Sequence, residues 1–355
     1  MIRRAAPAAV LLLALAGGCA RKETEAPRFA LDHCERVTVI DGATGAAVTG
    51  AEDLDIDRAG KRIFVSAYDR RRAEAAAARR DDAVPQGGLY AIDIAALNSG
   101  APSVESRSLI DPSRVEGGLR PHGISFNQES GVLAFVNRGY VAEGNSWRRR
   151  IELMAFNPSQ PDVLDILPAD CAANDVASRD SQWLVTLDHG GCGWRAGFED
   201  VTGAHSGRVV DDKGAEILTG LDFANGAVTA PDGRVVIAAT RERALHVIDA
   251  SNAVLPVKLS AAPDNLTVSD GGRVVAAVHP DLFALGLQRK LGIGRSPSRI
   301  VEVDLASGDQ RLLFDDPGAE RISAATAAIH TGELLVIGSV IDSGLVVCRD
   351  ETAPR

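Results

Sequence analysis

The chain has 355 residues, with 38 lysines and arginines against 48 aspartates and glutamates, so its formal net charge is −10. This acidity argues against a nucleic-acid partner, because phosphate binding requires a basic face. Aromatic residues make up only 4% of the chain, too few for a surface that stacks bases. The length is ample for one large hydrophobic core.

Residues 1–18 have the order of a secretory signal peptide. A basic start is followed by an apolar run over residues 5–16 and by small residues that end at Cys19. The apolar run is too short to cross a bilayer. The small residues before Cys19 resemble the lipobox of bacterial lipoproteins, which predicts lipidation of Cys19; an ordinary cleaved signal is the alternative.

The residues after Cys19 indicate where the mature protein resides. Ala20, in place of an aspartate, resembles the outer-membrane class of lipoproteins. We therefore expect a lipid anchor in the cell envelope, at the outer membrane and facing the periplasm. Residues 19–33 would form a polar tether, and residues 34–350 one folded domain.

Four cysteines remain besides Cys19, an even number that an oxidising compartment can pair fully. Pairing Cys34 with Cys348 would join the two ends of the mature chain, and the chain-entropy estimate for so long a loop is roughly 5 kcal/mol, which strain and residual structure reduce. Cys171 and Cys192 would then form a second disulfide. A zinc site that uses these two cysteines with His189 is the alternative.

Two kinds of apolar run alternate along the chain. Six continuous runs, each after a turn, cover residues 60–66, 131–136, 181–187, 233–239, 272–278 and 332–338. More strictly alternating runs follow them at residues 89–94, 151–156, 208–212, 245–249, 300–305 and 344–348. Continuous runs fit strands buried on both faces, and alternation fits strands with one wetter face. We therefore predict the inner and outer strands of a repeated β-sheet unit.

The recurrence predicts an all-β fold, a six-bladed β-propeller with variable loops. Its spacing of about 40 to 70 residues is typical of propeller blades. A strand at residues 36–40 would share a blade with the last run, which ends at Cys348, and so close the ring. Two β-sandwich domains are the alternative, but they leave the repeated pattern unexplained.

Short motifs rich in oxygen donors precede or begin the predicted inner strands. They are Glu52-Asp53, His122, Asn174-Asp175, Asn225 and Asp264-Asn265. One end of every inner strand faces the axis of a propeller, so we expect these side chains to converge there. Calcium takes six to eight oxygen ligands, which makes a metal on the axis the natural hypothesis.

The paired motifs predict two metal ions rather than one. Neighbouring residues of an extended strand point in opposite directions, so each pair can serve two sites. One site would receive Glu52, Asn174, Asn225, Asp264 and Asn265. The other would receive Asp53 and Asp175, together with backbone carbonyls and water. Oxygen donors without a thiolate favour calcium over zinc or copper.

At these residues the chain resembles the paraoxonase/arylesterase family of six-bladed calcium propellers, relatives of the gluconolactonases. The matching segments are residues 50–56, 121–125, 174–177, 222–226, 231–233, 264–268 and 278–280. The resemblance extends from about residue 34 to residue 348, and Cys34 and Cys348 stand where that family has its ring-closing disulfide.

The resemblance implies a calcium-dependent hydrolase of lactones and aryl esters. It assigns the five residues of the first site to a catalytic calcium, and Asp53, Asp175 and the carbonyl of Ile124 to a structural calcium. The metal would polarise the ester carbonyl, and His122 would activate water. The alternative is a non-catalytic calcium propeller that binds a ligand or a protein partner at the cell envelope.

One residue departs from the family pattern. Arg138 stands where the family has a second histidine, and an arginine stays charged and cannot relay a proton. It could instead hold a substrate oxygen or depress the pKa of His122. His189 and His279 resemble family positions near the tunnel mouth and are secondary candidates.

Two further segments could border the central tunnel that runs along the axis of a propeller. Residues 69–82 form a helix-prone insertion that corresponds to a mobile lid in the family, and a solvated helix is the simpler interpretation. Residues 282–291 are largely apolar and would line the tunnel mouth, contact lipid or pack over the propeller.

Overall fold

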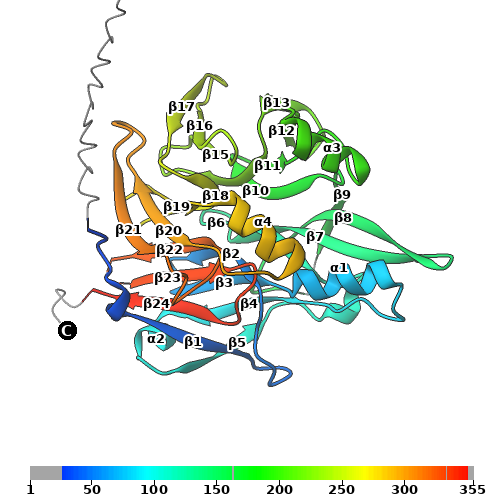
Figure 1. Cartoon of the computed structure of the whole chain (residues 1–355), viewed down its shortest axis with the longest axis horizontal. Helices are drawn as coiled ribbons and strands as arrows, with labels where there is room; N and C mark the ends of the chain where they lie inside the picture. Colours follow the sequence, from blue (N-terminus) through cyan, green and yellow to red (C-terminus); the bar gives the residue numbers. More distant parts are fainter. Residues whose placement is uncertain (1–25, 162–163, 333, 351–355) are drawn as a thin grey trace, which may run out of the picture.

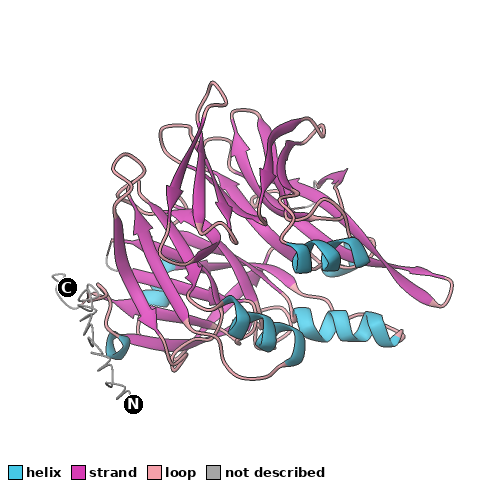
Figure 2. Cartoon of the chain, turned by 45° about the horizontal axis from the view of Figure 1, so that its top comes forward, coloured by secondary structure: helices cyan, strands magenta, loops and turns pink. Residues whose placement is uncertain are grey.

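The computed structural model describes residues 26–161, 164–332 and 334–350. The predicted signal peptide, Cys19 and the first part of the predicted tether lie outside these residues. Strands make up about half of the described chain, and helices far less (Figure 2). Within the described residues, none of the helices combines the length and the apolar character needed to span a bilayer.

Four sheets contain four consecutive antiparallel strands each (Figure 1). The first has β6 (Pro121–Asn127), β7 (Val132–Glu143), β8 (Ser146–Phe156) and β9 (Asp165–Pro168). The second has β10 (Ala173–Arg179), β11 (Gln182–Leu187), β12 (Gly207–Asp211) and β13 (Glu216–Leu221). The third has β14 (Ala224–Thr229), β15 (Val235–Ala239), β16 (Ala244–Ile248) and β17 (Val254–Lys258). The fourth has β18 (Ala262–Val268), β19 (Val274–His279), β20 (Ser298–Val303) and β21 (Gln310–Asp316).

The fifth sheet has eight strands and unites the two ends of the chain. Its strands are β1 (Cys34–Asp41), β2 (Ala51–Asp57), β3 (Arg62–Ala67), β4 (Gly88–Asp93), β5 (Ser103–Ser108), β22 (Ala325–Thr331), β23 (Leu334–Ser339) and β24 (Leu345–Arg349). Their order is β2-β3-β4-β5-β1-β24-β23-β22. Strand β1 pairs with β24 in antiparallel register, with Cys34 opposite Cys348, and a disulfide joins these two cysteines. The predicted pairing of the first and last strands is therefore confirmed.

The first strands of the sheets form a closed circuit. β2 contacts β6, and contacts then run through β10, β14, β18 and β22 back to β2. Each group of four strands is thus arranged like a propeller blade around a common axis. This circuit is incompatible with the alternative of two β-sandwich domains.

The continuous apolar runs are the second strands of these units, not the innermost ones as predicted. All five residues of β15, for example, are buried, and β14 separates β15 from the axis. A second strand is covered on both faces by neighbouring sheets, so it must be apolar throughout. The innermost strands carry polar residues at the axis, which breaks the apolar pattern that would reveal them.

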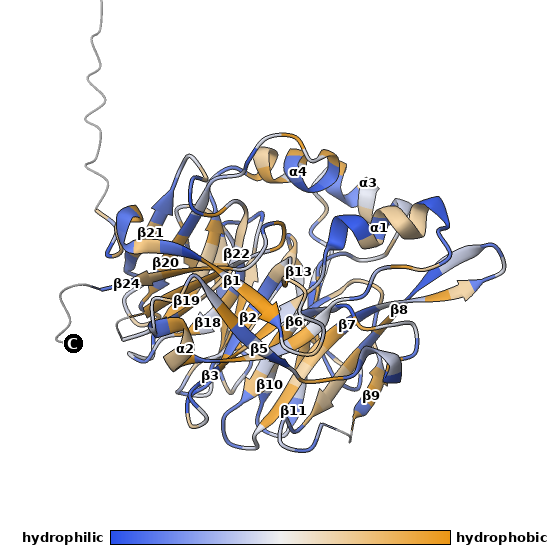
Figure 3. Cartoon of the chain, turned by 90° about the horizontal axis from the view of Figure 1, so that it is seen from below, coloured by the Kyte–Doolittle hydropathy of each residue, from blue (hydrophilic) through white to orange (hydrophobic). Residues whose placement is uncertain are grey.

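Three helices lie on one side of the ring (Figures 2 and 3). They are α1 (Arg70–Arg79), α3 (Trp194–Thr202) and α4 (Leu282–Leu291); the shorter elements are α2 (Ile94–Asn98), η1 (Leu31–His33) and η2 (Pro112–Arg114). The side chain of Asp69 caps α1 by accepting a hydrogen bond from the N–H of Arg72 at 2.9 Å. The predicted helical insertion is therefore confirmed.

The packed part of the chain begins before Cys34. The side chain of Phe29 is buried, and its N–H donates to the carbonyl of Leu313 in β21 at 2.9 Å. Residues that the sequence analysis assigned to the end of a polar tether thus pack on the sheet.

Candidate functional site

Each of the six first strands has an irregularity in its ladder at an equivalent point. The pairing with the second strand skips Glu52 in β2, His122-Gly123 in β6, Asn174-Asp175 in β10, Asn225-Gly226 in β14, Asp264-Asn265 in β18 and Thr326 in β22. A β-bulge releases its extra residues from the ladder and re-aims their side chains. All the oxygen-donor motifs predicted from the sequence lie at these bulges.

Two glycines allow the bulged strands to approach one another closely. A Cβ atom on Gly123 would overlap the carboxylate of Asp175, and one on Gly226 would overlap the backbone carbonyl of Asp264. Glycine is therefore needed in the Pro-His-Gly and Asn-Gly motifs because the next strand occupies the space of a side chain.

Four of the five residues predicted for the catalytic calcium line one small cavity of about 20 Å³. They are Glu52, Asn174, Asn225 and Asp264, from four different strands. This volume holds about one water molecule or one ion. The fifth residue, Asn265, does not line the cavity; its Nδ2 donates to the backbone carbonyl of Glu52 at 2.9 Å.

Two residues that the sequence analysis missed add oxygen atoms to this cavity. Asp188 follows β11 and accepts a hydrogen bond from Nδ2 of Asn174 at 3.0 Å. Thr326 donates from Oγ1 to the carbonyl of Glu52 at 2.7 Å. Thr326 lies at the sixth bulge. The bulge itself gives no recognisable pattern in the sequence, so Thr326 could not be found in advance.

The two cavity amides point their nitrogens at carboxylates. Nδ2 of Asn225 donates to Oδ1 of Asp264 at 2.6 Å, as Nδ2 of Asn174 does to Asp188. A half-turn of each amide exchanges its nitrogen for its oxygen without moving the backbone. The donor set can therefore present oxygen atoms only, from carboxylates, amides and a hydroxyl, and this chemistry fits a hard cation.

Glu52 and His122 form a buried pair beside the small cavity. Nδ1 of His122 contacts Oε2 of Glu52, and Nη1 of Arg70 lies 3.5 Å from Oε1. Burial raises the pKa of Glu52, but the charge and hydrogen bond of His122 outweigh it and lower this pKa to about 2. Burial, followed by the charge of Arg138, lowers the pKa of His122 to about 4. At neutral pH the carboxylate is thus ionised and the imidazole neutral.

Nε2 of His122 is buried and has no hydrogen-bond partner among the described residues. In a neutral imidazole that donates from Nδ1 to Glu52, Nε2 carries a free lone pair. His122 is not part of the lining of the small cavity, but its partner Glu52 is, so the pair places a proton acceptor next to a residue of that cavity.

The two aspartates predicted for the structural calcium are buried in the adjoining part of the axis. Asp53 accepts hydrogen bonds from the N–H groups of Leu54 and Ile124, both at 2.8 Å. Asp175 accepts from those of Val176 at 2.7 Å and Ala227 at 2.6 Å. Each carboxylate thus links its own strand to the next one around the ring. Ile124 is linked to this site by its N–H, and the role of its carbonyl as a calcium ligand stays a prediction.

These aspartates lack a positive partner. Burial and the proximity of Asp175 raise the pKa of Asp53 well above its usual value, and burial likewise raises the pKa of Asp175. Asp55, which the sequence analysis missed although it shares a strand face with Asp53, has a pKa raised by burial to about 6. No cationic side chain of the described residues hydrogen-bonds to Asp53 or Asp175. Closely spaced buried carboxylates of this kind fit a divalent cation.

Arg138 lies behind the site. Its side chain is buried, and Nη2 donates to the carbonyl of Ala173 at 2.9 Å and lies 3.9 Å from Oδ2 of Asp188. It lines neither the small cavity nor the larger one above it. Its effect on the site is therefore electrostatic, through the pKa of His122.

Both secondary histidines contact carboxylates at the tunnel mouth. Nε2 of His279 lies 2.6 Å from Oδ2 of Asp264. His189 lies between Asp188 at 2.7 Å and Asp200 at 2.9 Å. Burial opposes protonation of His189, but these two carboxylates raise its pKa to about 9.

A larger cavity of about 990 Å³ opens above the small one and shares lining residues with it. Its walls come from the N-terminal part of α1, from α3 and from α4, the three helices gathered on this side of the ring (Figure 3). Arg70 of α1 and Arg289 of α4 line both cavities. The segment at residues 282–291 therefore borders the tunnel mouth.

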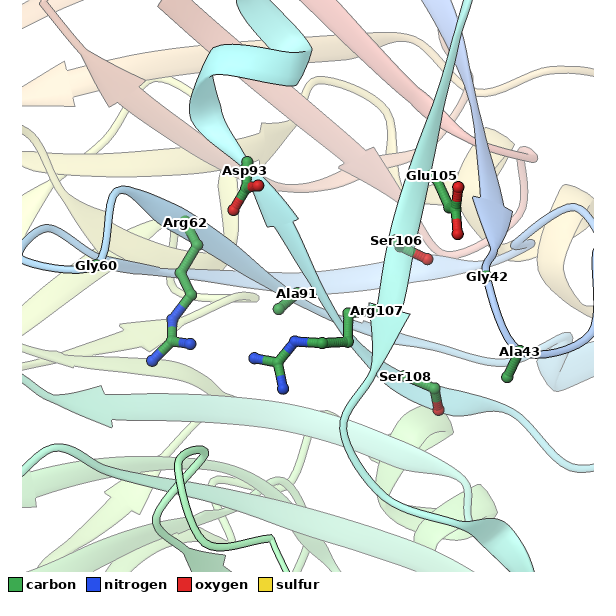
Figure 4. Close-up of a pocket in the computed structure, with 10 residues that line it drawn as sticks. All are labelled: Gly42, Ala43, Gly60, Arg62, Ala91, Asp93, Glu105, Ser106, Arg107 and Ser108. Carbon is green, nitrogen blue, oxygen red and sulfur yellow. The ribbon is translucent and has the colours of Figure 1, made fainter.

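Another cavity, of about 640 Å³, lies away from these residues. Figure 4 shows its lining on β3, β4, β5 and the turns after β1 and before β3, with Arg62 and Arg107 prominent. None of the predicted site residues lines it, so it has no part in the site.

Cys171 and Cys192 form a disulfide. Both sulfurs are consumed in this bond, so the two cysteines do not offer thiolates to zinc, although Asp170 lies close to them.

Comparisons with known proteins support the fold. The sequence matches no protein-family model and no curated protein. A structural-genomics target described as a gluconolactonase candidate superposes with a TM-score of 0.50 and 13% identity, over 90% of this chain and 93% of that one. A Bacteroides thetaiotaomicron protein of unknown function superposes with a TM-score of 0.52 and 9% identity, over 89% and 75%.

A luciferin-regenerating enzyme also matches, with a TM-score of 0.49 and 11% identity, over 89% of this chain and 94% of that one. At these identities the likeness shows the fold alone. The chain is a β-propeller-like protein whose structural neighbours include a gluconolactonase-like propeller.

Proposed function

We propose that this protein is a calcium-dependent hydrolase of lactones or aryl esters, built on a six-bladed propeller of the paraoxonase/arylesterase type. The observation that carries the proposal is the small cavity: Glu52, Asn174, Asn225 and Asp264 reach it from four strands, and His122 stands beside it. The description of the gluconolactonase-like neighbour is consistent with a lactone substrate.

The proposal keeps the two ions that the resemblance implies but takes Asn265 out of the catalytic set, because Asn265 does not line the small cavity. Glu52, Asn174, Asn225 and Asp264 would hold the catalytic calcium, with Asn265 supporting the backbone of Glu52. Asp53 and Asp175 would hold the structural one. Calcium in the catalytic site would supply the positive charge that stabilises the oxyanion of ester hydrolysis.

His122 serves as the general base in this proposal. Glu52 fixes the imidazole by its contact with Nδ1, and the buried Nε2 accepts the proton of the attacking water. Ser66 on β3 supports the same residue by donating to the carbonyl of His122 at 2.5 Å. The base is therefore held at both its side chain and its backbone.

The proposal places the protein in the cell envelope. Lipidation of Cys19 would anchor the propeller at the outer membrane, facing the periplasm. The two disulfides support an oxidising compartment of this kind. Labelling of cells with an alkynyl fatty acid, compared between wild type and Cys19→Ala, tests the anchor.

A substrate panel tests the activity. Purified protein should hydrolyse members of a panel of lactones and aryl esters, and a calcium chelator should abolish the reaction. A protein that binds calcium but cleaves no member of the panel would favour the non-catalytic calcium propeller instead.

A further inference from the structure

Arg289 of α4 lines the tunnel mouth. It lines both the small and the large cavity. Among the residues that the structure describes, its guanidinium has no hydrogen-bond or salt-bridge partner. An arginine in a partly buried cavity normally pairs with a carboxylate, because desolvating an unpaired charge is costly.

Arg289 also faces a second guanidinium. Proximity to Arg70 is the largest cause of a lowered pKa at Arg289, followed by burial. Arg70 is the first residue of α1 and already pairs with Glu74 at 3.1 Å and lies 3.5 Å from Glu52. Two helices inserted at distant points of the chain thus bring like charges to the same cavity floor.

Among the described residues, Glu52, Asp264 and Glu74 attract Arg289 electrostatically, but none of them hydrogen-bonds to it. Each acidic residue of the cavity is engaged by another partner. Asp69 caps α1, Glu74 pairs with Arg70, Asp188 and Asp200 contact His189, and Asp264 contacts His279. Arg289 is therefore a guanidinium at the cavity floor to which none of the described carboxylates hydrogen-bonds.

We propose that Arg289, assisted by Arg70, binds a carboxylate of the substrate, so that the protein acts on lactones or esters that carry a negative charge. This inference rests on the proposed function and adds the substrate class to it. A guanidinium binds a carboxylate through paired, charge-assisted hydrogen bonds. Because Arg70 is already shared with Glu52 and Glu74, Arg289 is the guanidinium shared by both cavities that remains available to a carboxylate.

The rest of the cavity indicates the remainder of this ligand. Apolar side chains form part of its wall: Phe223, Leu282, Leu285, Val340 and Ile341. The ligand would therefore place its carboxylate on Arg289 and a compact apolar body against these residues, with its ester carbonyl toward Asn225 and Asp264.

A matched pair of probes that cannot be hydrolysed tests the inference by binding alone. Calorimetry should show that cyclohexanecarboxylate binds the wild-type protein at least about tenfold more tightly than cyclohexanecarboxamide, which has nearly the same shape but no charge. Arg289→Gln should abolish this preference, and Arg289→Lys should keep part of it.

Lys290→Gln is the control, since it removes one positive charge from the next residue of α4, whose side chain is 77% exposed. This variant should retain the preference for the carboxylate. Equal binding of acid and amide to the wild type would overturn the inference, as would a preference that persists in Arg289→Gln.

A hydrolysis experiment separates the two proposals. The lactone 5-oxotetrahydrofuran-2-carboxylate should have a higher kcat/KM than its carboxamide, and Arg289→Gln should remove the difference. If the probes bind as expected but no lactone is cleaved, the carboxylate site stands and the hydrolase proposal fails. If neutral and charged lactones are cleaved equally, the hydrolase proposal stands and the carboxylate site fails.

Discussion

Glu52 and His122 are 70 positions apart in the chain, yet their side chains contact each other at the axis of the ring. Both residues are skipped by the strand pairing of their own sheets, so the two bulges create the contact. The same displacement turns Glu52 toward the small cavity, which makes it the residue that connects a candidate metal site to a candidate base.

Replacing two of the three carboxylates that line the small cavity, those of Glu52 and Asp264, tests the catalytic calcium site. Glu52→Gln combined with Asp264→Asn keeps the side-chain shapes but removes two negative charges. We expect kcat/KM for a lactone to fall by at least about 100-fold, because charge stabilisation of the oxyanion is lost. Activity that survives the double substitution would rule out catalysis through this site.

The matched control for that variant is Asp53→Asn with Asp175→Asn, which also replaces two carboxylates, those of the structural calcium site. Each substitution also takes an oxygen acceptor from backbone N–H groups of neighbouring strands. We expect a lower melting temperature with a nearly unchanged KM. A large rise in KM without loss of stability would contradict the division into two sites.

His122→Gln separates the base from the metal site. The substitution removes the proton acceptor, so we expect kcat to fall on the order of 10²- to 10⁴-fold. The effect of a calcium chelator on the melting temperature should remain, since the oxygen donors are intact. His205→Gln, at an exposed histidine, is the control and should leave kcat unchanged. An unchanged rate in His122→Gln would leave the metal site standing and refute the role of the base.

The ring-closing disulfide should matter more for stability than the local one. Cys34→Ser with Cys348→Ser opens a loop of 314 residues, and Cys171→Ser with Cys192→Ser opens one of 21. The chain-entropy estimate gives losses of about 5–6 and about 3 kcal/mol, as upper values. Denaturant unfolding of both pairs checks the order. A greater loss for the shorter loop would show that the ring closes without help from its disulfide.

His189 predicts a dependence of stability on pH. Its pKa in the folded protein is raised to about 9, above the usual 6.5. A raised pKa stabilises the fold fully below pH 6.5, and this contribution is lost as pH rises through about 9. It amounts to at most about 3 kcal/mol. The difference in unfolding free energy between wild type and His189→Gln should therefore shrink from pH 6 to pH 10; a constant difference would contradict the assignment.

The polar residues at the axis of the ring could be predicted from the sequence, but the strands that carry them could not. The polar pairs at Asn174-Asp175 and Asp264-Asn265 were visible because such motifs recur before the repeated apolar runs. The structure places both pairs at bulges. The innermost strands themselves were missed, since polar bulged strands lack the continuous apolar run that marks β15 or β19.

The sequence indicated that residues 282–291 could line the tunnel mouth, but not that Arg70 and Arg289 meet there. Arg70 and Arg289 belong to helices inserted after β3 and after β19, and their meeting depends on how each insertion folds back over the ring. Helix propensity indicates that such segments are helical, but it carries no information about where they dock. Asp188 was missed for a similar reason, because it follows its strand as an ordinary turn residue would.

Calcium removal tests the central claim most directly. Melting temperature and the rate of lactone hydrolysis would be measured on the same protein sample with calcium, with a calcium chelator, and after calcium is restored. Calcium ions that bind only the folded state add about 2.7 kcal/mol per site to the free energy of unfolding when their free concentration is 100 times their Kd. The chelator should therefore lower the melting temperature and abolish the hydrolysis rate. Restoring calcium should restore both. An unchanged melting temperature and an unchanged rate in the presence of the chelator would contradict the account.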